Sequence, residues 1–253
     1  MSIINWLVER CLLPPLAALQ FLTLIPPIIR RPFTPRELGR AVGFFPLVGA
    51  LLGGVLTMLD RLLSPVFPSS VAAALILTTW VIVTGALHID GFLDSLDGLF
   101  GGYTPDRRLE IMHDERVGAF GFAGGVLLLT LKVTALTALP QRGAALLVAP
   151  TMARWGMSLS IALFPYARAE GLGRAMKDQT SWEQVVLSTA IALAVAWLSG
   201  RPLGWLALAL TSLLTWLVAR FVLGRIPGLT GDIYGALCET LELALLLTFA
   251  TVT

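Results

Sequence analysis

Three aspartates, Asp90, Asp94 and Asp97, lie within eight residues of one another in the segment HIDGFLDSLDG, directly after a long apolar run. If this segment is helical, their i, i+4 and i+7 spacing places them within roughly 60° of one another on one face. Carboxylates this close repel one another, and near an apolar boundary the repulsion is costly unless a cation neutralises it. Because oxygen ligands without thiolates favour hard ions, the spacing predicts a Mg²⁺ site formed by the three side chains.

The next segment combines acids with arginines. RRLEIMHDERVGAFG begins at residue 107 and contains Glu110 and Asp114 at i, i+4, with Arg116 close behind. Carboxylates for a metal beside arginines for phosphate are what phosphoryl transfer needs, because that chemistry relies on positioning and charge neutralisation. A phosphotransferase, a pyrophosphatase and a cation-coupled carrier all suit such a cluster. Alternatively, the segment is a solvated loop of alternating charge that has no catalytic or binding role.

The elements that must position these residues are apolar helices. Of the 253 residues, 56% are hydrophobic and only 13% are charged, whereas roughly 25% are charged in soluble domains. The apolar runs are long enough for spans, which need about 20 residues each. We therefore predict an all-α, polytopic integral membrane helical bundle that forms a single domain over residues 1–253. The seven expected spans are residues 41–59, 69–88, 119–139, 143–164, 185–199, 203–222 and 234–253.

The stretch before these spans, up to residue 29, is a poor simple span. It contains Glu9, Arg10 and the pair Pro14-Pro15. We expect an interfacial or broken helix there, because proline interrupts the backbone hydrogen bonds of a helix interior.

The basic residues indicate the orientation of the bundle. Threading the seven spans through a bilayer places twelve arginines and lysines in the connections on one side and three on the other. The positive-inside rule assigns the richer side, which carries residues 89–118 and 165–184, to the cytoplasm. A carrier is expected to hold its key polar groups near the midplane, whereas here they gather at one face, as in an enzyme that uses cytosolic substrates. We expect a multi-pass protein of the cell (inner) membrane with its active-site loops in the cytoplasm.

Two cations, Lys132 and Arg154, lie within apolar runs, where burial of each costs at least about 2.5–3.5 kcal/mol. One interpretation is an ion pair with Glu239 or Glu242 that fixes helix packing. The other, which we favour, is that both cations face the bundle interior and contact phosphate oxygens.

Other polar residues flank the aspartates and the later spans. His88 is a candidate general base, although a lone histidine more often satisfies a structural hydrogen bond. In YARAEGLGRAMKD, Arg168, Glu170 and Lys177 belong either to a solvated loop or to a substrate loop. Asp232, in GLTGDIYG, is either the N-cap of the last helix or a further acid of the site.

Several ordered motifs resemble the cobalamin synthase (adenosylcobinamide-GDP ribazoletransferase) family. GALHIDGFLDSLDG and RRLEIMHDERVGAFG look like the family signature, and AVGFFPLVGALLGG, YARAEGLG and TGDIYGALCETLEL extend the resemblance over most of the chain. The family often has Ala, Cys, Lys and Ser where this chain has Leu93, Leu96, His113 and Glu115. The aspartates and the Asp114–Arg116 frame match.

The resemblance implies an integral membrane transferase, supported by Mg²⁺, that joins alpha-ribazole or its 5'-phosphate to adenosylcobinamide-GDP and releases GMP. The resemblance and the charge pattern together suggest six catalytic residues: Asp90, Asp94, Asp97, His88, Lys132 and Arg154. The three aspartates are the expected metal ligands. The expected substrate-binding residues are Arg116, Asp114, Glu110, Arg168, Glu170, Lys177, Asp232 and Glu239. An enzyme like the CDP-alcohol phosphotransferases, a cation-coupled transporter and an inactive scaffold are the alternatives. We expect the lipid bilayer and no nucleic acid as a partner, and leave open whether the protein is a homo-oligomer.

Overall fold

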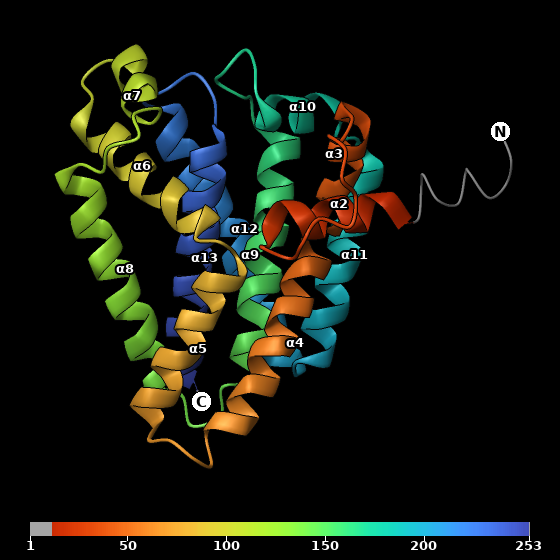
Figure 1. Cartoon of the computed structure of the whole chain (residues 1–253), viewed down its shortest axis with the longest axis vertical. Helices are drawn as coiled ribbons and strands as arrows, with labels where there is room; N and C mark the ends of the chain where they lie inside the picture. The colour runs from red at the N-terminus through yellow and green to blue at the C-terminus, as the bar shows by residue number, and fades with distance from the viewer. Residues whose placement is uncertain (1–11, 253) are drawn as a thin grey trace, which may run out of the picture.

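The computed structural model describes residues 12–252, which form a bundle of long helices with shorter helices gathered at one end (Figure 1). The prediction of an all-α, polytopic membrane bundle is confirmed. In the described residues, five helices are long and apolar enough to cross a membrane, or up to seven if each of two bent helix pairs is one span. The helices are α2 (Leu13–Leu22), α3 (Pro35–Ala41), η2 (Val42–Phe44), α4 (Phe45–Leu63), α5 (Ser69–Val83), α6 (Leu87–Gly101), α7 (Pro105–Ile111), α8 (Ala119–Ala138), α9 (Gly143–Leu163), α10 (Leu172–Gln179), α11 (Trp182–Leu198), α12 (Arg201–Leu223) and α13 (Gly231–Val252).

The N-terminal part of the described chain is a short helix, in agreement with a broken or interfacial segment. α2 has only ten residues and carries its proline pair in the first turn, where a missing N–H costs nothing. It lies across the long helices (Figure 1) and buries Ala17, Ala18 and Leu22. Glu9 and Arg10 lie outside the described residues.

A sharp bend separates α5 from α6. The two helix axes differ by 87°, because Gly85 (φ 61°) and Ala86 (φ 55°) both adopt the left-handed conformation. Such a conformation is open to glycine but costs an alanine roughly 1–2 kcal/mol. The predicted span 69–88 therefore ends early, and the aspartates lie on a separate helix that crosses the end of the bundle.

α6 and α13 meet backbone to backbone. A Cβ added at Gly91 would lie 2.8 Å from the carbonyl oxygen of Asp232, and one at Gly235 would lie 3.1 Å from that of His88. The first contact is too short for any Cβ, and the second is tighter than most Cβ contacts, so glycine favours this approach at both positions. The contact brings the first turn of α6 beside the first turn of α13.

Candidate active site

A cavity of about 310 Å³ lies where α6, α9, α10 and α13 meet residues 164–171. It brings together side chains that are far apart in the sequence. Five of the residues that the sequence singled out line it: His88, Asp90, Arg168, Glu170 and Asp232.

Asp232 belongs to this cavity rather than to a helix cap. The backbone N–H of Ile233 donates to Oγ1 of Thr230 at 3.2 Å, so Thr230 caps the start of α13. The Asp232 carboxylate accepts from Arg168 at 2.8 Å. The pair joins the N-terminus of α13 to the segment that follows α9.

The three aspartates of α6 point to different surroundings. Asp97 is buried, and its two carboxylate oxygens accept from the backbone N–H groups of Gly118 at 2.7 Å and Gly121 at 2.9 Å. It thereby caps the N-terminus of α8, where unpaired N–H groups favour an anion. Asp94 is half-buried and lies within electrostatic range of Asp90, Asp232 and Arg168.

The acids that line the cavity are therefore Asp90, Glu170 and Asp232, and Asp94 lies within electrostatic range of Asp90 and Asp232. This set differs from the triad that we expected. Within residues 12–252, no group of three or more His, Cys, Asp or Glu side chains is gathered in the way that would hold a metal ion.

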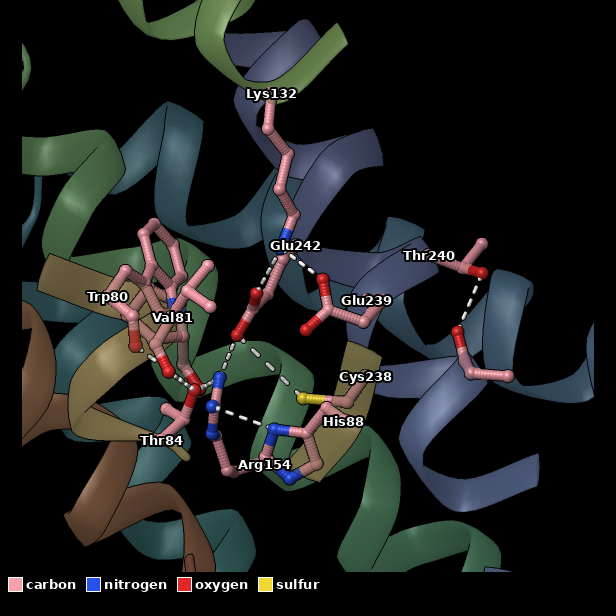
Figure 2. A network of polar contacts seen from close by, with 12 residues as sticks. Trp80, Val81, Thr84, His88, Lys132, Arg154, Cys238, Glu239, Thr240 and Glu242 are labelled. Atoms are coloured by element: carbon pink, nitrogen blue, oxygen red, sulfur yellow. Dashed lines mark hydrogen bonds and ion pairs between the residues drawn. The ribbon is translucent and has the colours of Figure 1, made fainter. Parts of the chain in front are cut away.

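Lys132 and Arg154 form a buried ionic network with the last helix (Figure 2). Lys132 Nζ lies 2.5 Å from both Glu239 and Glu242, and Arg154 pairs with Glu242. Arg154 also contacts Nδ1 of His88 at 3.2 Å. The ion pair that we considered as a packing device is thus present with both glutamates, and neither cation lines the cavity.

Four other predicted substrate-binding residues lie outside the cavity. Glu110 pairs with Arg107 at 2.7 Å on the surface of α7. Asp114 pairs with Arg116 at 2.7 Å, and hydrogen bonds from this guanidinium lower the pKa of Asp114 to about 2. Lys177 donates to the carbonyl of Ala162.

Two tyrosines complete the cavity wall and were not predicted. Tyr166 and Tyr234 stack with their ring centroids 6.0 Å apart. Burial raises the pKa of Tyr166. Each stands two residues from a charged residue that we did single out, Arg168 or Asp232. Both tyrosines lie within motifs that carry the family resemblance, YARAEGLG and TGDIYG, and this position could have identified them as site residues.

Comparison with known proteins decides the family. Residues 14–250 match the family model described as cobalamin-5-phosphate synthase. The chain belongs to this family. One relative of this chain is a protein of Pseudomonas fluorescens named adenosylcobinamide-GDP ribazoletransferase. The two sequences are 43% identical over 245 residues, which cover 93% of this chain and 98% of the relative. A relative of the same name from Desulforamulus reducens is 40% identical over 229 residues, 89% of this chain and 91% of that protein. No solved structure matches.

The resemblance read from the motifs is therefore confirmed. This cobalamin-5-phosphate synthase family member is a transferase with several apolar helices, a multi-pass membrane protein.

Proposed function

We propose that this family member joins alpha-ribazole, or its 5'-phosphate, to adenosylcobinamide-GDP, forming adenosylcobalamin or its 5'-phosphate and releasing GMP. The name shared by the relatives supports this reaction. The observation that carries the proposal is the cavity, in which Asp90, Arg168 and Asp232 from three separate segments line one space. Acids beside an arginine at a nucleoside-sized cavity suit the transfer of a phosphoryl group between large substrates.

Different residues of the cavity have different roles in this displacement. A hydroxyl of the ribazole attacks the phosphate attached to cobinamide, a new P–O bond forms, and the bond to the bridging oxygen of GMP breaks. The proton of the hydroxyl passes to a carboxylate of the cavity, Asp90 or Asp232. The Arg168 guanidinium stabilises negative charge on the phosphate oxygens.

The acids also fit a magnesium ion. Mg²⁺ usually takes only one or two carboxylates, with water and substrate phosphates as its other ligands. Asp90 and Asp94, one helical turn apart on α6, supply that number, and Asp232 stands on the facing helix. When bound, the ion neutralises charge on the diphosphate. Asp97 is the poorest candidate of the three, because both of its oxygens already accept from α8.

The test is release of GMP by the purified protein. Incubated with adenosylcobinamide-GDP, alpha-ribazole and Mg²⁺, the wild-type chain should release GMP, and chelation should largely abolish the reaction. Asp90→Asn and Asp232→Asn should each lower turnover by about 10²–10³-fold, the effect of removing a preorganised electrostatic group.

Asp106→Asn is the matched control, because Asp106 is an exposed acid of α7 that does not line the cavity. Its turnover should stay at the wild-type value. A wild-type chain that consumes no adenosylcobinamide-GDP but moves solute across sealed vesicles would instead support the transporter. Normal turnover in both cavity variants would place the active site elsewhere.

A further inference from the structure

The cavity wall has an apolar part contributed by elements other than those that carry its charges. Phe21 of α2, Phe45 of α4, Met157 and Ile161 of α9 and Met176 of α10 form it. The charged residues come instead from α6, the segment 164–171 and the start of α13. A ligand that fits both parts has an apolar, flat portion joined to a polar, phosphate-reactive portion.

Two buried polar atoms on this wall lack a partner within the described residues. They are Nε2 of His88 and the hydroxyl of Tyr234, whose residues are 2% and 4% exposed. A buried donor or acceptor without a partner costs about 1–3 kcal/mol, so native proteins usually satisfy such groups. Because both residues line the cavity, a bound ligand is the natural partner of the two atoms.

The neighbouring network determines what His88 offers. A guanidinium only donates, so the contact between Arg154 and Nδ1 makes Nδ1 an acceptor. The neutral ring then carries its hydrogen on Nε2. Arg154 is held in turn by Glu242 (Figure 2). His88 thus presents an N–H donor, which assigns it to ligand binding instead of the general-base role that the sequence suggested.

We propose that the apolar part of this cavity binds the heteroaromatic base of the acceptor nucleoside, with His88 Nε2–H donating to the base and the Tyr234 hydroxyl bonding to the ribose of the same nucleoside. This assignment rests on the proposed function, since alpha-ribazole is the nucleoside in question. Its base is a benzimidazole joined to ribose through one ring nitrogen. The other ring nitrogen keeps a free lone pair, and the base has no N–H of its own.

The chemistry of the wall favours this base over guanine. A benzimidazole buries its whole ring against phenylalanine, methionine and isoleucine side chains and needs a single hydrogen-bond donor. Guanine would bury N–H and carbonyl groups against the same apolar side chains, at the cost of unpaired polar groups. The volume of about 310 Å³ is near the lower end of the usual range for small-ligand pockets, roughly 300–1,000 Å³, which suits a nucleoside.

Two substitutions remove the proposed contacts one at a time. Tyr234→Phe deletes only the hydroxyl. His88→Asn keeps an acceptor near Nδ1 for Arg154 but deletes the Nε2–H donor, whereas His88→Gln places an amide N–H near Nε2. We expect Tyr234→Phe and His88→Asn each to raise the KM for alpha-ribazole and the Kd of alpha-ribazole alone by about tenfold, with the KM for adenosylcobinamide-GDP unchanged. His88→Gln should recover most of the lost affinity.

Tyr103→Phe and His113→Asn are the matched controls, because Tyr103 is 94% exposed and His113 is exposed beside α7. Both should bind alpha-ribazole like the wild type, and guanosine should not compete for the site. Unchanged affinity for alpha-ribazole in the cavity variants, or a rise confined to the KM for adenosylcobinamide-GDP, would overturn the assignment. A third outcome separates the two proposals. If the wild type releases no GMP, but Tyr234→Phe still binds alpha-ribazole more weakly than the wild type does, the base site stands and the proposed reaction is rejected.

Discussion

Glu242 contacts both buried cations of the ionic network, whereas Glu239 contacts only Lys132. The two cations and two carboxylates balance in charge, and all four side chains are at most 5% exposed. The two glutamates therefore differ in how much each contributes to the stability of the folded protein. Loss of Glu242 leaves Arg154 without a carboxylate and Lys132 with one, while loss of Glu239 leaves each cation paired.

We predict that Glu242→Gln destabilises the protein more than Glu239→Gln. Leaving a buried charge unpaired typically costs about 3–5 kcal/mol, and only the first substitution does so. Thermal unfolding of both variants in the same detergent measures the difference. Equal losses of stability would show that Arg154 does not depend on Glu242.

The residue scale is where sequence reasoning was least complete. The low charge content identified Lys132 and Arg154 as unusual and named both glutamates as partners, because an intramembrane charge needs a counter-charge. It did not reveal that Arg154 also contacts His88. That contact joins residues 66 positions apart, and nothing in the local pattern of either segment encodes it.

At the scale of elements, α6 does two things at once. Its first turn places Asp90 in the cavity wall, with Asp94 within electrostatic range of Asp90 and Asp232. A later turn holds the start of α8 through Asp97. The helical periodicity predicted one shared face for the three aspartates. It could not predict that the start of α8 would lie beside the third, because the position of α8 depends on packing between distant segments.

We predict that Asp97→Asn and Asp94→Asn fail in different ways. Asp97→Asn should lower the free energy of unfolding by about 0.5–2 kcal/mol, as for a lost helix cap, since an amide offers one acceptor oxygen in place of two. Asp94→Asn removes repulsion from neighbouring acids and should keep stability while turnover falls sharply. Unfolding curves and turnover for each variant decide. A fall in turnover at unchanged stability for Asp97→Asn would restore the three-aspartate metal site.

At the α5–α6 bend, we predict that substitutions at two adjacent positions change the stability of the protein in opposite directions. Ala86→Gly should stabilise the protein by about 1 kcal/mol, because glycine adopts a positive φ without strain. Gly85→Ala should destabilise it, since an added Cβ would be strained at φ 61° and would lie 2.8 Å from the side chain of Leu24. Thermal unfolding measures both. Stabilisation by Gly85→Ala would show that the bend is absent from the folded protein.

At the scale of the whole molecule, the sequence predicted nearly every long helix but not how the chain turns between them. Seven apolar runs correspond to helices or bent pairs, because hydropathy and length suffice to recognise a span. The run 69–88 has no proline, and Ala86 has no residue-type preference for a positive φ. Its bend follows from tertiary contacts such as the hydrogen bond from Leu24 N–H to the carbonyl of Val83 at 2.8 Å.

The arrangement of the bundle makes the predicted orientation testable. α7 and α10 lie at the same end, opposite the connection between α4 and α5 (Figure 1). In a Cys11→Ser background, with Cys238 buried, cysteines at Tyr103 and Gln179 should react only with reagents on the cytoplasmic side. A cysteine at Phe67 should react only from the outside. The reverse pattern in intact cells would invert the topology that the twelve-to-three charge asymmetry predicts.

The backbone contact between α6 and α13 separates the geometry of the site from the lipid-facing surface. Main-chain atoms around Gly91 and Gly235 set the distance between the two helices, whereas residues such as Leu206, Leu213 and Trp216 face outward. Exchanging the outward set for hydrophilic residues changes what the bundle dissolves in and leaves the spacing of Asp90 and Asp232 as it is. The bilayer thus acts as the solvent of this transferase, and a water-soluble redesign that keeps the two glycines retains the reacting groups in place.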